Sequence, residues 1–197
     1  MTVMKEDILE QLVDEYLKHK GYFTNHNIKF KPSKNHIDYI QSQDSVNSDI
    51  DVLAIHPQRN GPEKVLAVNC KSWQSGLTPA RKIIEIEQGK VISGRKAWKS
   101  FRELYSHKWS EAFIEKISSV TGSDGFTHVT AVTKINGDKA TWETHQPFTD
   151  RLRGAPVSLM SLNEILDDMY PSIQKTPAPS NVGRLLQIIK ASGWINR

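Results

Sequence analysis

The fold is decided by residues 48–73, which run Ser-Asp-Ile-Asp-Val-Leu-Ala-Ile-His-Pro-Gln-Arg-Asn-Gly-Pro-Glu-Lys-Val-Leu-Ala-Val-Asn-Cys-Lys-Ser-Trp. Two short apolar runs flank a polar segment at residues 58–63. This pattern predicts a β-hairpin with strands over residues 50–56 and 64–72. Asn60-Gly61 is the strongest turn signal between them, because both residues tolerate a positive φ angle.

Each predicted strand carries polar residues that a buried sheet would not otherwise favour. Asp51 lies near the start of the first strand, and Asn69 and Lys71 lie near the end of the second. Residues two apart in a strand share a face, so Asn69 and Lys71 point one way and Cys70 the other. Because the start of one hairpin strand lies beside the end of the next, we expect Asp51, Asn69 and Lys71 to meet at one end of the sheet.

These three side chains suit a metal-assisted site that acts on a phosphate. A carboxylate and a backbone carbonyl can hold Mg²⁺, which prefers oxygen ligands and keeps several waters. The Lys71 ammonium could orient or deprotonate a water, or stabilise charge that builds on a phosphate. The alternative is that Asp51 only ends a strand and Lys71 extends to solvent. For a short motif taken alone, that alternative is the favoured one.

Composition limits the class of protein. With 197 residues the chain suits one domain with a short appendage and can bury a sizeable core. The net charge of +4 and the pI near 9.1 favour an anionic partner only modestly. The single cysteine, Cys70, excludes an internal disulfide, is expected to be a buried spectator and fits the reducing cytoplasm. We expect no membrane span, signal peptide or Cys/His metal cluster.

An amphipathic helix is expected over residues 6–20, and Gly21 is its stop signal. Its apolar stripe centres between Leu9 and Tyr16. Glu10 and Glu15 fall about equally far from that centre, one on each border. Helix geometry therefore leaves open which of the two, if either, leans into a site.

The rest of the chain alternates between strand and helix signals. We expect strands over residues 22–30, 126–133 and 156–160, short extended pieces over 36–40 and 140–143, and a loop over 41–47. We expect helices over residues 79–88, from about 95 onwards, over 110–120, over 165–169 behind a capping box of Ser161 and Glu164, and over 181–192. This order predicts an α/β fold with a central mixed sheet and helices on both sides.

A basic stretch follows the second predicted helix, with Trp98 and Phe101 interleaved. Its cations are Lys90, Arg95, Lys96, Lys99 and Arg102. Arg95, Lys99 and Arg102 are spaced four and three residues apart, so in a helix they would share one face and could neutralise the phosphates of DNA. A solvated helix face with the two aromatic side chains in the core is an equal alternative.

Four short motifs, in order, resemble those of the PD-(D/E)xK nuclease superfamily, nearest to the Mrr-like restriction endonucleases and the nuclease-like proteins related to Holliday-junction resolvases. They are Glu10 ahead of Tyr16-Leu17, then Gly21-Tyr22, then Asp49-Ile50-Asp51-Val52, then Val68-Asn69-Cys70-Lys71. The resemblance covers residues 6–73. It implies a restriction-endonuclease-like sheet flanked by helices and a DNA endonuclease that uses Mg²⁺ or Mn²⁺.

Matched position by position, the resemblance assigns roles to particular residues. Asp51 is the metal ligand and Lys71 the lysine that acts on the attacking water, and the Cys70 carbonyl would complete the metal site. Glu10, rather than Glu15, is the helix glutamate. Asn69 stands where the family has Glu or Gln, so it offers only a neutral carbonyl and metal affinity should be lower.

Two hypotheses follow. The first is an active Mg²⁺-dependent endonuclease of the restriction or DNA-repair type, for which a homodimer would suit the cutting of both strands. The second is a catalytically weak or inactive DNA-binding module, or a subunit of a larger DNA-processing assembly. Residues 1–170 are expected to form the nuclease-like domain, residues 171–180 a Pro-rich linker and residues 181–197 a C-terminal helix.

Overall fold

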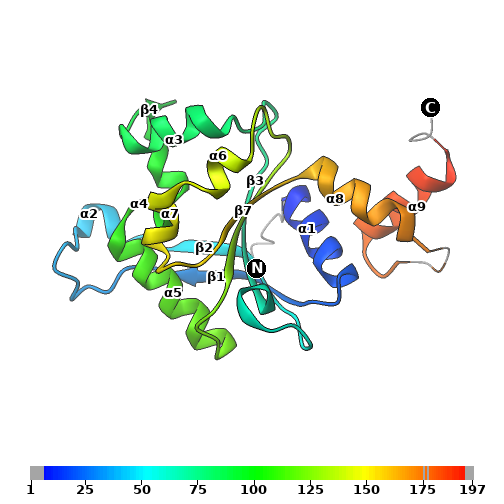
Figure 1. The fold of residues 1–197 in the computed structure, drawn as a ribbon, viewed down its shortest axis with the longest axis horizontal. Coiled ribbons are helices and arrows are strands. Elements are labelled where there is room, and N and C mark those ends of the chain that lie inside the picture. The colour runs from blue at the N-terminus through cyan, green and yellow to red at the C-terminus, as the bar shows by residue number, and fades with distance from the viewer. Residues whose placement is uncertain (1–6, 175, 177, 194–197) are drawn as a thin grey trace, which may run out of the picture.

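A central mixed sheet of five strands organises the computed structural model, which describes residues 7–174, 176 and 178–193 (Figure 1). The strand order is β1-β2-β3-β6-β7. The first three strands pair antiparallel, and β3, β6 and β7 pair parallel. The bounds are β1 Phe23–Phe30, β2 Ser48–Ile55, β3 Val65–Lys71, β6 Thr127–Val132 and β7 Val157–Ser161. The expected α/β class is confirmed.

The predicted hairpin of β2 and β3 is confirmed as the middle of the sheet. Its register places Val52 opposite Val68 and Leu53 opposite Ala67. The connection contains a 3₁₀ turn, η1 (Gly61–Lys64), and Gly61 has a φ of 67°, a conformation that glycine adopts without strain. Both strands are largely buried because helices cover both faces of the sheet.

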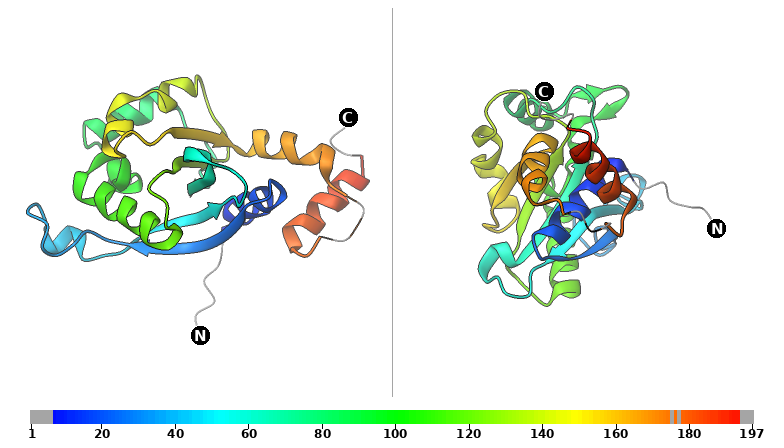
Figure 2. Two further views of the ribbon diagram at one scale, coloured as in Figure 1. Left: turned by 60° about the horizontal axis from the view of Figure 1, so that its bottom comes forward. Right: turned by 90° about the vertical axis from the view of Figure 1, so that its right-hand side faces the viewer.

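Helices pack on both faces of the sheet, as Figures 1 and 2 show. One face carries α1 (Ile8–His19) and α8 (Leu162–Met169), with α9 (Asn181–Ala191) packed against α1. The other face carries a second group of helices with a separate apolar core: α3 (Pro79–Glu87), α4 (Arg102–Tyr105), α5 (His107–Thr121), α6 (Ala140–Glu143) and α7 (Gln146–Arg151). No described helix has both the length and the apolarity needed to cross a membrane.

Helix α1 forms as its sequence pattern predicts. Asp7 is the N-cap and accepts a hydrogen bond from the Leu9 amide at 2.8 Å. Leu9, Val13 and Leu17 recur every four residues and are buried, and each contributes roughly 1.5–3 kcal/mol relative to an exposed side chain. The expected start at residue 6 lies outside the described residues.

Two expected extended pieces and one expected loop are wrong. Residues 36–40 form turns, and the supposed loop over residues 41–47 contains a helical turn, α2 (Gln41–Asp44). Asp44 holds this turn: its carboxylate accepts from the Ile40 amide at 2.7 Å, the Trp109 indole at 3.1 Å and the Lys108 ammonium at 2.6 Å. Residues 140–143 form α6 rather than a strand, because Trp142 turns inward and is completely buried.

The helix expected from residue 95 onwards is also wrong. The chain instead makes a small hairpin of β4 (Val91–Ile92) and β5 (Arg95–Lys96), then a 3₁₀ turn, η2 (Ala97–Ser100), before α4. Ser93 and Gly94 turn the hairpin with φ angles of 48° and 77°, which no helix permits. Arg95, Lys99 and Arg102 therefore do not share one face of a helix.

The remaining expected elements are confirmed with small shifts at their ends. Strands β6 and β7 and helices α3, α5, α8 and α9 lie where the sequence predicts them. Ser161 and Glu164 form the predicted capping box, although the expected N-cap Thr78 makes no side-chain capping bond. A 3₁₀ turn, η3 (Tyr170–Ser172), opens the expected linker. Ser180 Oγ donates to Glu15 Oε2 at 2.5 Å, which fixes the start of α9 to α1.

Candidate functional site

The candidate site lies at the end of the β2–β3 pair where Asp51 and Lys71 meet. Asp51 is 9% exposed, and its Oδ2 accepts a hydrogen bond from the Cys70 backbone amide at 2.6 Å. Burial raises the pKa of Asp51 to about 6, with help from the charges of Asp49 and Glu103, although the Lys71 charge and the Cys70 amide oppose this rise. The Lys71 charge therefore acts on a buried carboxylate of perturbed pKa.

The Cys70 side chain takes no part in this site, although the Cys70 backbone does. Its side chain lies on the opposite face of β3, in the apolar core beneath α1. Burial raises the pKa of its thiol well above the usual value, and the charge of Asp51 adds to the effect. A buried thiol held in its protonated form is a poor nucleophile, which agrees with the expectation of a spectator.

Glu10 reaches the site from the first turn of α1. Burial, together with the charges of Asp51, Asp7 and Asp49, raises the pKa of Glu10 to about 7. Glu15 instead accepts the hydrogen bond from Ser180 at the far side of the helix. The structure thus brings Glu10, and not Glu15, near Asp51.

Asn69 is buried on the same face of β3 as Lys71 and is fixed by a partner that sequence reasoning missed. Its Nδ2 donates to Glu103 Oε1 on α4 at 2.6 Å. His128 Nε2 on β6 lies 3.1 Å from the same oxygen. Asn69 Oδ1 is buried and has no hydrogen-bond partner among the described residues. The amide orientation follows from this contact, because a carboxylate can accept only from the nitrogen.

Glu103 is a charged group inside the core. Burial disfavours its ionised form, but the hydrogen bond and charge of His128, together with the charge of Lys71, outweigh burial and hold the pKa of Glu103 below its usual value. The ionised Glu103 also raises the pKa of Asp51. Glu103 therefore connects the Asn69 amide to the charges at the strand ends.

One signal in the sequence could have indicated this cluster. In the buried strand β6, alternate positions face the same side, so His128 and Thr130 place two polar groups toward one apolar core. A buried polar group needs a partner, which predicts a polar residue on the helix that covers that face. Nothing in the sequence singles out Glu103 as the partner, because it stands within a basic stretch.

The basic residues expected to contact DNA are brought near one another, but not as a helix face. Arg95 Nη2 and Arg102 Nε both donate to the Lys99 carbonyl at 3.3 Å. Arg102 packs over the Trp109 ring at 4.4 Å, and burial and the charge of Arg95 lower its pKa. Arg102 is therefore used in packing, whereas Arg95, Lys96 and Lys90 are exposed.

The side chains around Asp51 decide whether this place could hold the expected Mg²⁺ ion. Within the described part of the chain, no three His, Cys, Asp or Glu residues are grouped closely enough to hold an ion by themselves. Mg²⁺ is often bound by one or two carboxylates and several waters, however, and carboxylates with raised pKa values gain from a nearby cation. Asp51, Glu10 and the unpartnered Asn69 Oδ1 fit such a water-rich site.

Comparisons with known proteins add little to this geometry. No protein-family model and no curated protein sequence matches the chain. Among solved structures, the chain is similar to a protein of unknown function, AF1548, with 11% sequence identity and a TM-score of 0.41. The match covers 95% of this chain and 79% of that one.

Proposed function

We propose that this chain is a metal-dependent endodeoxyribonuclease that hydrolyses phosphodiester bonds in DNA. The observation that carries the proposal is the meeting of Asp51 and Lys71 at adjacent strand ends, with Glu10 placed against Asp51 from α1. The motif resemblance to PD-(D/E)xK nucleases supports the same assignment. The fold is a sheet flanked by helices, which that superfamily also requires.

The ligands for Mg²⁺ or Mn²⁺ would be Asp51, Glu10 and the Cys70 carbonyl, with waters filling the remaining positions. When bound, the ion would supply Lewis acidity toward a phosphate oxygen and toward a water. Asn69 Oδ1 is a neutral oxygen whose direction is fixed by the bond from Nδ2 to Glu103, so Asn69 is a candidate ligand to the ion or to one of its waters.

Lys71 would act on the phosphate and on the attacking water. The Lys71 ammonium would stabilise negative charge on the phosphate as a water oxygen attacks phosphorus and the bond to the leaving oxygen breaks. Lys71 would also orient the attacking water, and the proton that this water loses would pass to bulk water, because a bound ion would lower the pKa of the water. The leaving oxygen then takes a proton from solvent, which balances the hydrolysis.

The test is cleavage of supercoiled plasmid by the wild-type chain with Mg²⁺ or Mn²⁺. Asp51→Ala and Lys71→Ala should each abolish nicking while the melting temperature stays within a few degrees of wild type. Glu15→Ala is the matched control, because it removes a carboxylate from the same helix as Glu10 but away from the site. Wild type that cleaves no form of DNA with either ion would overturn the proposal.

A second candidate function is a DNA-binding module without catalysis. The observation that favours it is the neutral Asn69 at a position that would otherwise supply a charged ligand, together with the absence of a three-residue ligand group in the described residues. Such a module would bind DNA without Mg²⁺, would weaken steeply with salt and would keep its affinity in Asp51→Ala.

A further inference from the structure

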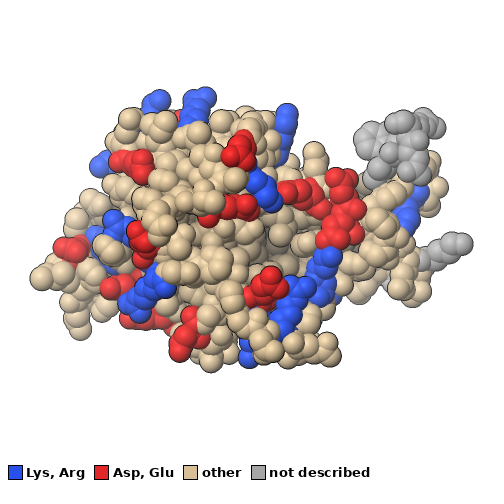
Figure 3. Space-filling model, in the orientation of Figure 1, with Lys and Arg blue, Asp and Glu red and all other residues tan. Residues whose placement is uncertain are grey.

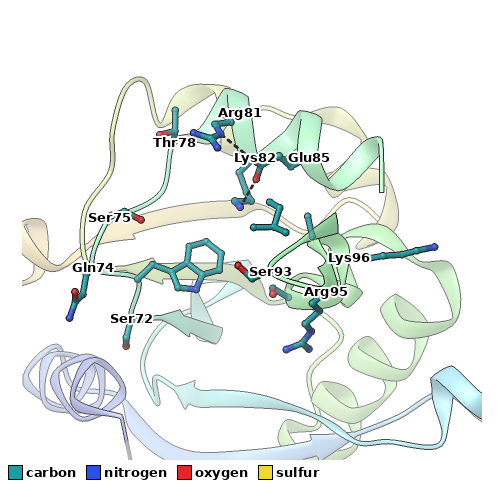
Figure 4. Close-up of a pocket in the computed structure, with 15 residues that line it drawn as sticks. Ser72, Gln74, Ser75, Thr78, Arg81, Lys82, Glu85, Ser93, Arg95 and Lys96 are labelled. Carbon is teal, nitrogen blue, oxygen red and sulfur yellow. Dashed lines mark hydrogen bonds and ion pairs between the residues drawn. The ribbon is translucent and has the colours of Figure 1, made fainter. Parts of the chain in front are cut away.

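A groove begins where the candidate site ends. It has a volume of about 900 Å³ and lies between the segment that follows Lys71, helix α3 and the β4–β5 hairpin (Figure 4). Ser72, directly after Lys71, is the first residue to line it, and the Ser72 hydroxyl donates to Asp7, the N-cap of α1. We call it the Trp73 groove, after its largest side chain. The first lining residue of the groove is thus the chain neighbour of Lys71.

The charge of the Trp73 groove is positive. Arg81 and Lys82 line it from α3, and Arg95 and Lys96 line it from the hairpin. Its single carboxylate, Glu85, is buried and accepts from Arg81 at 2.9 Å and Lys82 at 2.6 Å. Burial opposes ionisation of Glu85, but these two hydrogen bonds outweigh it and lower its pKa, so it stays ionised and orients the two cations. Figure 3 shows basic side chains projecting along the edge of the molecule formed by α3 and β4.

Trp73 gives the groove an aromatic surface beside these cations. Its ring is half-buried and meets Phe101 edge-on, with centroids 5.8 Å apart and planes at 80°. The Lys82 ammonium lies 4.9 Å from the centre of the ring. Packing against Phe101 fixes the plane of the indole, so little conformational freedom remains to be lost when a ligand stacks on it.

A positive groove with a fixed aromatic ring is the combination that binds single-stranded nucleic acid, because the cations follow the backbone and the ring stacks on a base of any sequence. The volume lies within the range of about 300–1,000 Å³ that suits small molecules, so the groove is large enough to hold single nucleotides. Ser72, Ser75 and Ser93 add neutral hydrogen-bonding groups around the rim.

We propose that the Trp73 groove binds unpaired nucleotides of the DNA strand beside the phosphate that is cleaved, with one base stacked on Trp73. The substrate of the nuclease is then DNA with a single-stranded segment next to the cleaved bond, rather than continuous duplex. This inference rests on the proposed function for its account of cleavage, but the binding itself needs no catalysis.

The experiment measures binding of the full chain in EDTA, so that no cleavage occurs. Fluorescence anisotropy compares a labelled oligothymidine strand with a duplex of the same length at about 150 mM salt, where charges are screened beyond about 8 Å. The single strand should bind more tightly and should quench tryptophan fluorescence. Trp73→Leu should weaken single-strand binding by about tenfold, since stacking contributes much of the affinity per base, and should leave duplex binding unchanged.

Two matched variants separate stacking and groove charge from other effects. Trp73→Phe keeps a ring that can stack and pack on Phe101, so it should retain most of the affinity that Trp73→Leu loses. Arg95→Ala should weaken binding more than Lys90→Ala, because Arg95 lines the groove whereas the exposed Lys90 does not. Duplex bound as tightly as single strand, or equal losses in Trp73→Phe and Trp73→Leu, would overturn the proposal.

The same samples distinguish this failure from that of the proposed function. Cleavage assays with Mn²⁺ on a duplex and on a duplex with a single-stranded tail report the catalytic claim. Cleavage of both substrates at equal rates, with no effect of Trp73→Leu on binding, refutes the groove and keeps the nuclease. Tight, Trp73-dependent binding without any cleavage refutes the nuclease and keeps the groove as a binding site.

Discussion

Replacing Asn69 by aspartate tests whether the buried polar cluster explains the neutral residue at this position. Asn69 Nδ2 lies 2.6 Å from Glu103 Oε1, and both side chains are almost fully buried. Asn69→Asp would put a second carboxylate oxygen where the donor now sits. Two buried carboxylates at that distance cannot both ionise, so the pair must retain one proton in the folded state.

The loss of folding stability in Asn69→Asp depends on pH, because the folded state of this variant binds one proton more tightly than the unfolded state does. The retained proton has a pKa raised above its value of about 3.9 in the unfolded chain. The variant therefore approaches wild-type stability below about pH 4, where the proton is present in both states, and loses stability as pH rises. The loss is about 1.4 kcal/mol for each pH unit while one extra proton is bound on folding, which is about 4 kcal/mol by pH 7.

The assay is urea unfolding followed by tryptophan fluorescence from pH 4.5 to pH 8, with the difference from wild type taken at each pH. The double variant Asn69→Asp/Glu103→Gln is the control, because it exchanges the acid and the amide and restores one donor and one acceptor across the contact. It should recover much of the stability at pH 7. An Asn69→Asp difference that is small at pH 7, or that does not change with pH, would refute the reasoning.

Three further predictions follow from other parts of the structure. Burial holds the pKa of Asp51 at about 6 and that of Glu10 at about 7, above their values in the unfolded chain. The free energy of unfolding of the metal-free chain should therefore fall as pH rises from about 4 to 7. The double variant Asp51→Asn/Glu10→Gln should make this fall smaller in urea titrations at a series of pH values. Asp44→Ala removes the buried carboxylate that pairs with Lys108 and accepts from the Trp109 indole, and it should lower stability by about 3–5 kcal/mol, measured by chemical denaturation at pH 7. Ser161→Ala removes the capping box of α8 and should cost about 1 kcal/mol in the same assay, and no loss would contradict the cap.

Much of the sheet could be predicted because its signals are local. The β2–β3 hairpin shows two apolar runs about a turn, and α1 shows apolar residues at helical spacing before Gly21. The β4–β5 hairpin could not be predicted in the same way. Its residues carry helix-like spacing of cations, and only the positive φ angles at Ser93 and Gly94 exclude a helix there.

Part of the site could also be predicted, for a different reason. Asp51 and Lys71 lie near the same end of two adjacent strands of one hairpin, so the pairing of these strands brings their charges close enough to interact. Glu103 and His128 come from α4 and β6, and their contact with Asn69 depends on how distant segments pack. Single-sequence patterns contain no information on such packing. The choice of Glu10 over Glu15 likewise came from family resemblance, because the helix wheel treats both alike.

The most direct test of the central claim is a calorimetric titration of Mn²⁺ into the full chain at pH 7.5, beside Asp51→Asn. This variant is nearly isosteric and keeps an oxygen that can accept from the Cys70 amide, so its fold should be intact. We expect saturable binding to wild type with release of protons, because the ion displaces protons from carboxyl groups of raised pKa. We expect no measurable binding to Asp51→Asn. Equal binding by both proteins, or by neither, would contradict a metal site at Asp51.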